Sequence, residues 1–81
     1  MTAGYAFLAW AVLDGQHGYH IYWRYTPGVN YRNGTLIALD PGLTGIQWAA
    51  TSGRNVYCVV MAVDANGHEG VASKESLISV L

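Results

Sequence analysis

The chain has 81 residues, four of them basic and five acidic, and its formal net charge is −1. A chain of this length forms one domain, residues 1–81, whose single core is near the lower size limit for stability. Binding to phosphates requires clustered Lys and Arg, whereas the four basic residues here are scattered along the chain and the net charge is slightly negative. We therefore expect no nucleic-acid partner.

The composition is rich in apolar residues and poor in charged ones. Hydrophobic residues are 52% of the chain and charged residues 11%, whereas charged residues are about 25% of a typical globular domain. Two explanations remain open at this point. Either small polar side chains and glycine cover the surface, as in many β-sandwiches, or much of the surface is buried in an assembly.

The first predicted element is a strand at residues 6–12, with Ala6, Leu8 and Trp10 on one face. Trp10 is the expected core anchor of this strand. No basic residue precedes the apolar run, and the run is far shorter than the ~20 residues that cross a bilayer. We therefore expect neither a secretion signal nor a membrane partner.

The second predicted strand, at residues 19–25, alternates cleanly between two faces. One face carries Tyr19, Ile21, Trp23 and Tyr25, and the other carries His20, Tyr22 and Arg24. Pro27 and Gly28 end this strand, because proline cannot donate to a sheet and glycine permits a turn.

Two short strands follow. An Asn-Gly turn at residues 33–34 precedes a strand at 36–39, and a turn at 40–42 separates it from a strand at 44–49. In the second of these strands we expect the side chain of Trp48 to point inward.

Residues 55–64 form the predicted central strand, and both of its faces are apolar. One face carries Val56, Cys58, Val60 and Ala62, and the other carries Tyr57, Val59, Met61 and Val63. Cys58 is the single cysteine, which excludes an internal disulfide and a cysteine-based zinc site, and we expect it to be a buried small hydrophobe. A turn at residues 65–67 follows, and a last strand occupies residues 76–81.

This pattern of six strands without a helical period predicts an all-β sandwich. Three segments also resemble a fibronectin type III domain of the bacterial and phage variety. Leu8 and Trp10 resemble its second strand, residues 18–24 its third, and residues 57–73 its sixth strand, the turn and the start of its seventh. The resemblance implies an immunoglobulin-like sandwich of six to seven antiparallel strands that serves as a spacer, adhesion or assembly module, without catalytic residues or a cofactor.

The front of the chain departs from the family pattern, because the family's first strand is missing or truncated ahead of Trp10. The strand at residues 6–12 would then be an edge with unpaired backbone groups, which proteins usually cover. Our hypothesis is that a partner chain covers this edge by adding a strand or by packing closely.

A second expected binding surface lies on the central sheet, where apolar and aromatic side chains project together. The expected protein-binding residues are His20, Tyr22, Arg24, Tyr57, Val59, Met61 and Val63. Tyr and Met are common at protein interfaces, while valine and methionine lack the polar groups that a sugar site needs. Protein is therefore the preferred partner and carbohydrate the alternative. We expect a charge at Val59 or Met61 to abolish assembly without unfolding the chain.

No pattern of catalytic or metal-binding residues is present. His17 and His68 lie in loops expected at one end of the sandwich, near Asp64 and Glu69, but their spacing matches no metal motif. We expect no metal, no cofactor and no enzymatic activity.

The expected function is that of a non-enzymatic structural or assembly protein. The resemblance points to a decoration or accessory subunit of a virion, in a phage capsid or tail, whose partners are copies of itself or capsid and tail proteins. The alternative is an extracellular adhesion or carbohydrate-binding module of a larger secreted protein.

Overall fold

The computed structural model describes residues 3–11, 16–40 and 42–80. The strands are β1 (Ala3–Ala9), β2 (Gly18–Arg24), β3 (Thr35–Leu39), β4 (Gly45–Thr51), β5 (Asn55–Val63) and β6 (Ser76–Ser79). These six strands confirm the six predicted from the sequence, with ends shifted by a few residues. Within the described ranges there is no helix, and hence none long and apolar enough to cross a membrane.

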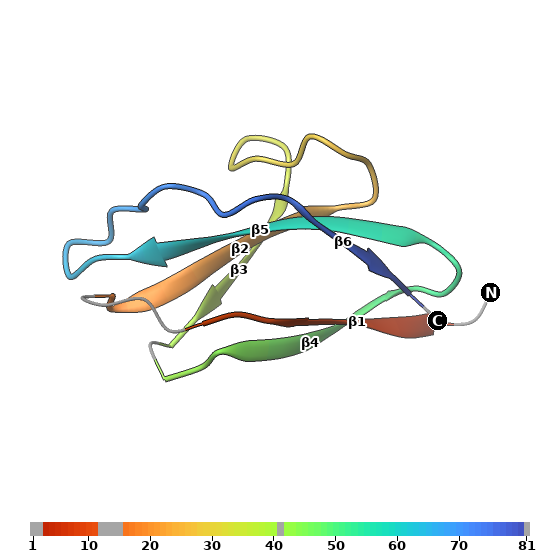
Figure 1. The fold of residues 1–81 in the computed structure, drawn as a ribbon, viewed down its shortest axis with the longest axis horizontal. Coiled ribbons are helices and arrows are strands. Elements are labelled where there is room, and N and C mark those ends of the chain that lie inside the picture. Colours follow the sequence, from red (N-terminus) through yellow and green to blue (C-terminus); the bar gives the residue numbers. More distant parts are fainter. Residues whose placement is uncertain (1–2, 12–15, 41, 81) are drawn as a thin grey trace.

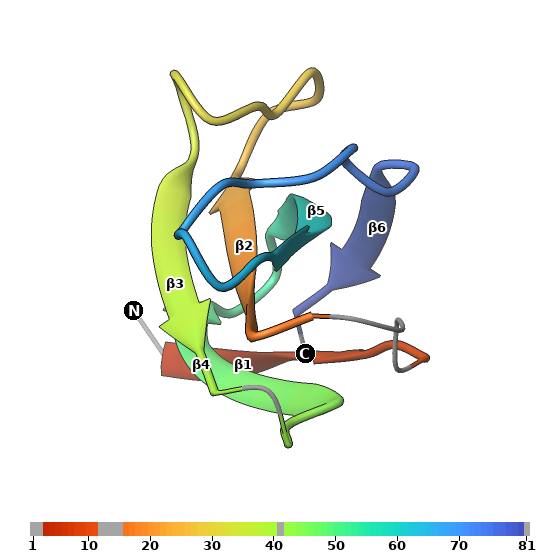
Figure 2. The same ribbon diagram turned by 90° about the vertical axis from the view of Figure 1, so that its left-hand side faces the viewer.

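The strands form two antiparallel sheets that lie one above the other (Figures 1 and 2). The smaller sheet pairs β1 with β4, and the larger sheet has the order β3-β2-β5-β6. Of the small-sheet strands, β1 is the one that approaches β6. The predicted all-β, two-layered architecture is therefore confirmed.

The strand β5 lies inside the larger sheet, between β2 and β6. It is the longest strand, and one side of it pairs with β2 along seven positions, from Gly18 opposite Val63 to Arg24 opposite Tyr57. On its other side, β6 pairs with Asn55–Cys58, and Ser73 continues the contact by donating its backbone N–H to the carbonyl of Val60 at 2.9 Å. The prediction of a central strand at this position is confirmed.

The main core fills the space between the sheets. Its buried members are Ala6, Ala50, Val56 and Val80, with Trp23, Tyr25, Trp48 and Ile78 packed around them. The rings of Trp23 and Trp48 lie 5.7 Å apart, and the ring of Trp10 meets the edge of Tyr19 at 5.3 Å. Trp23 and Trp48 thus share the main core, as the sequence predicts for a sandwich that needs large side chains to fill it, whereas Trp10 is half-buried and packs on Tyr19 outside this cluster.

The first strand begins earlier than predicted, at Ala3, and ends at Ala9, so Trp10 lies just beyond it. Pairing with β4 sets these limits, because Ala3 faces Thr51 and Ala9 faces Gly45. The backbone N–H of Trp10 still donates to the carbonyl of Thr44 at 2.8 Å. The last predicted residue of this strand, Val12, lies outside the described residues.

Glycines at two predicted turns have different roles. Gly67 has a φ of 81°, a left-handed conformation that favours glycine. Gly34 has no positive φ. It is needed for close packing, because a Cβ there would lie 2.8 Å from the Cβ of Tyr22 and 2.8 Å from a methyl of Val29.

Candidate protein-binding site

The seven predicted binding residues do lie on one face of the larger sheet, the face turned away from β1 and β4. The register places His20 opposite Met61, Tyr22 opposite Val59, Arg24 opposite Tyr57, and Val63 opposite Gly18. Directly opposed residues of antiparallel strands share a face. The placement of these residues follows the sequence prediction.

This face is not open, however, because the chain covers part of it. Tyr22 is 8% exposed, Val59 5% and Met61 7%, and Val29 from the β2–β3 connection belongs to the same buried cluster. They form a second core on the outer side of the sheet. A binding role for these residues stays a prediction, and the burial changes the expected effect of a charge at Val59 or Met61 from lost assembly to lost stability.

A glutamate from the β5–β6 connection holds the β2–β3 connection in place. Oε1 of Glu75 accepts hydrogen bonds from the backbone N–H groups of Gly28 and Val29, at 2.8 and 2.9 Å. Both connections rise on the same side of the larger sheet in Figure 1. The outer core is therefore closed by two segments that are far apart in the sequence and joined by one carboxylate.

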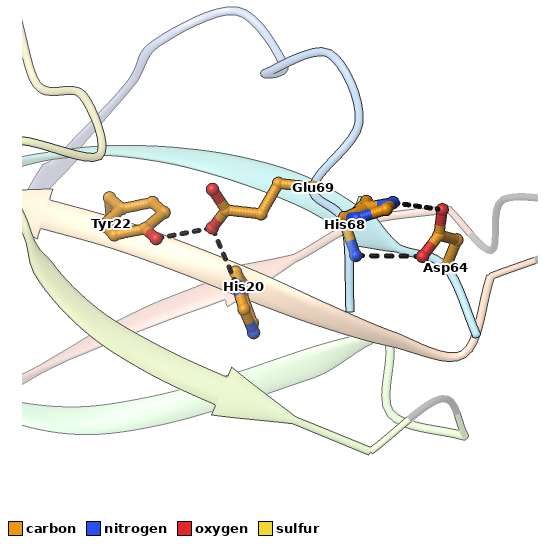
Figure 3. Close-up of polar contacts among 5 residues, drawn as sticks. All are labelled: His20, Tyr22, Asp64, His68 and Glu69. Carbon is orange, nitrogen blue, oxygen red and sulfur yellow. Dashed lines mark hydrogen bonds and ion pairs between the residues drawn. The ribbon is translucent and has the colours of Figure 1, made fainter. Parts of the chain in front are cut away.

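A second glutamate binds the sheet directly (Figure 3). Oε2 of Glu69 accepts a hydrogen bond from the hydroxyl of Tyr22 at 2.5 Å and lies 2.7 Å from Nδ1 of His20. The bond from Tyr22, and then that from His20, lowers the pKa of Glu69. The same bond to Glu69, together with burial, raises the pKa of Tyr22 to about 12.

The side chain of Asp64 stabilises the turn that follows β5. Oδ1 of Asp64 accepts hydrogen bonds from the backbone N–H groups of Asn66 and His68, both at 2.9 Å. The bond from His68 is the largest cause of the lowered pKa of Asp64. Among residues 3–11, 16–40 and 42–80, no three His, Cys, Asp or Glu side chains are grouped so that they could hold a metal ion.

The clearest exposed aromatic surface lies on the smaller sheet. Tyr5 and Phe7 are each 63% exposed, and they alternate along β1 with the buried Ala6. Their partners on β4 are Ala49 and Gln47, both exposed. Neither strand contains a charged residue.

The backbone of β1 is paired on one side only. The N–H of Trp10 points to β4, and alternate residues of an antiparallel strand direct their N–H and C=O to the same side. Ala6 and Leu8 therefore also pair with β4, whereas Tyr5, Phe7 and Ala9 direct their backbone groups to the opposite edge. Among the described residues, no strand lies along that edge.

A pocket of 330 Å³ lies where the end of β1 faces the β5–β6 connection. Its lining is Trp10, Ala11, Val60, Val71 and Ser73. The lining is mostly apolar, and Val71 is 95% exposed. The indole Nε1 of Trp10 is buried and has no hydrogen-bond partner in the described part of the chain.

The sequence interpretation missed the glutamates that cover the outer face and the aromatic pair on β1. For Tyr5 and Phe7 a signal was present, since they occupy the alternate positions to Ala6 and Leu8. For Glu69 and Glu75 there was none, because each contacts residues more than forty positions earlier in the chain.

Comparison of the chain with protein-family models, curated proteins and solved structures finds no match.

Proposed function

We propose that this chain is a non-enzymatic protein-binding module, a fibronectin type III-like sandwich that serves as a structural or accessory subunit of a larger assembly such as a virus particle. The observation that carries the proposal is β1, an uncharged strand with one unpaired edge and two outward aromatic side chains, Tyr5 and Phe7.

Such an edge is a liability in a protein that works alone. An exposed strand edge pairs readily with other chains, and proteins usually blunt it with lysine, proline or a covering segment. Residues 3–11 contain none of the charged residues or prolines that would do so. A surface built in this way is typical of one that a partner covers.

The distribution of strands between the layers supports the sandwich type. The chain starts in the smaller sheet, crosses to the larger for β2 and β3, returns for β4 and crosses again for β5 and β6. Crossing between layers in this manner is typical of immunoglobulin-like sandwiches.

The alternative function, carbohydrate binding, would use Tyr22 and Tyr57 as a stacking platform. The ring of Tyr22 is buried and its hydroxyl is bound to Glu69. We therefore do not propose it.

The test is the size of the native protein after gentle lysis of the cells that make it. We expect it to sediment well above its monomer mass of 8.8 kDa. A Tyr5→Ser/Phe7→Ser variant should move to the monomer fraction, whereas Tyr31→Ser, which alters an aromatic residue that is 56% exposed elsewhere, should not. Sedimentation of the unaltered protein as a monomer would reject the proposal.

A further inference from the structure

We propose that the free edge of β1 accepts an extended, uncharged segment of a different polypeptide, which adds as a strand and inserts an apolar side chain into the pocket beside Trp10. The inference rests on the proposed function, since it states how the partner binds at the same edge.

The edge offers hydrogen bonds at regular intervals. Tyr5, Phe7 and Ala9 each direct one N–H and one C=O away from β4, as the bond from Trp10 to Thr44 requires. An added strand would pair with these groups, and its backbone would supply part of the affinity.

The pocket supplies the specificity. Side chains of a strand alternate between faces, so a residue of the incoming segment opposite Trp10 would point between the sheets, while its neighbours, opposite Ala9 and Ala11, would lie on the outer face. There it would meet Trp10, Val60 and Val71. The segment is therefore expected to alternate, with a large apolar residue at the pocket position.

The side chains on the inner face of β1 become less buried along the strand toward this pocket. Ala6 is fully buried, whereas Leu8 and Trp10 are half-buried. The buried Nε1 of Trp10 has no partner among the described residues. Buried polar groups are nearly always hydrogen-bonded, and an added strand would bring backbone carbonyls beside this one.

The lining of the site carries no charge, and this favours an uncharged segment as the partner. Residues 3–11, Val60, Val71 and Ser73 carry no charge, so a charged residue at the pocket position would find no oppositely charged partner there. The larger sheet has four strands and the smaller two, and β1 lies on the β6 side. Pairing with a second copy through its own β1 is the competing outcome that the experiment distinguishes.

The experiment uses a short synthetic peptide in which leucine alternates with threonine, and a control peptide of the same composition with its leucines adjacent. Binding to the whole chain is followed by amide hydrogen exchange. We expect the alternating peptide to slow exchange at Tyr5, Phe7 and Ala9 and the control peptide to leave it unchanged.

Two pairs of variants distinguish the contribution of the β1 edge to peptide binding from that of the pocket. Phe7→Pro removes one edge-facing N–H and should abolish binding, whereas Phe7→Leu keeps that N–H and a large apolar side chain on the outer face and should retain it. Val71→Asn should weaken binding about tenfold, whereas Leu77→Asn, which alters an exposed residue of β6 outside the pocket lining, should not.

Strand addition would be rejected if the alternating peptide slowed none of these amides, or if dimers of the isolated chain protected them. Insertion into the pocket would be rejected by equal binding of both peptides or by unchanged binding to Val71→Asn. If the peptide fails while Tyr5→Ser/Phe7→Ser still releases the native protein from its assembly, only strand addition is rejected. If the native protein is a monomer, the proposed function itself is rejected.

Discussion

The carboxylate of Glu69 and the hydroxyl of Tyr22 are joined by a hydrogen bond of 2.5 Å that connects the β5–β6 segment to the outer face of β2. Glu75, six residues later, binds the β2–β3 connection through Gly28 and Val29. Together these two carboxylates fix the segments that close the outer core. Because these segments cover the outer face of the larger sheet, the edge of β1 is the surface that we propose for a partner.

Acid should weaken the fold through Glu69. The pKa of Glu69 is lowered from 4.5 by its bonds from Tyr22 and His20, so its stabilisation is present above about pH 4.5 and is lost as the pH falls through the lowered value. The urea midpoint of the unaltered chain should fall between about pH 7 and about pH 3 by more than that of Glu69→Gln. Equal falls in both proteins would contradict this role.

Alkali should act on the other partner of the same bond. The pKa of Tyr22 is raised from 10.0 to about 12, so its contribution to stability is present below pH 10 and is lost as the pH rises from about 10 to about 12. Tyr22→Phe should cost about 1.5 kcal/mol or more at neutral pH, because it removes one hydrogen bond to a charged group. It should also reduce the alkaline loss of stability in urea titrations, and an unchanged alkaline loss would argue against the bond.

A charge in the outer core should destabilise the chain. Met61→Glu would bury a carboxylate beside Tyr22 and Val59, and we expect the free energy of unfolding to fall by about 2 kcal/mol or more. Leu36→Glu is the matched control, since Leu36 is 48% exposed and lies opposite Tyr22 on the same face. The control should change stability by less than about 0.5 kcal/mol. A folded, fully stable Met61→Glu would mean that this face is open after all.

The thiol of Cys58 should be inert while the chain is folded. Cys58 is fully buried, and this burial is the largest cause of the raised pKa of its thiol, about 11. Thiolate is the reactive form, so labelling by a thiol reagent at neutral pH should follow the rate of unfolding. Rapid labelling of the native protein would show that β5 is less covered than the packing indicates.

Local patterns in the sequence were sufficient for the strands and for their faces. The alternation in residues 19–25 and the two-faced run in residues 55–64 identified β2 and β5, which pair with each other in the structure. The turn at Asp64 was likewise predictable, because its side chain bonds to the backbone only two and four residues away.

The cover of the outer face was not predictable in the same way. Val29, Glu69 and Glu75 reach it from connections whose paths depend on contacts across the fold rather than on their own residues. The sequence analysis expected the outer face of β5 to be an exposed binding surface, but the β2–β3 and β5–β6 connections cover part of it. An exposed aromatic surface lies instead on β1, and its alternation of Tyr5 and Phe7 with Ala6 and Leu8 was in the sequence but not interpreted.

The most direct test of the account is residue-specific amide hydrogen exchange along β1 in the isolated, monomeric chain. We predict slow exchange at Ala6, Leu8 and Trp10, whose N–H groups bond to β4, and fast exchange at Tyr5, Phe7 and Ala9, which should slow only when a partner strand is added. Slow exchange at all six positions in the free monomer would show that the edge is already covered, and the proposed docking edge would not exist.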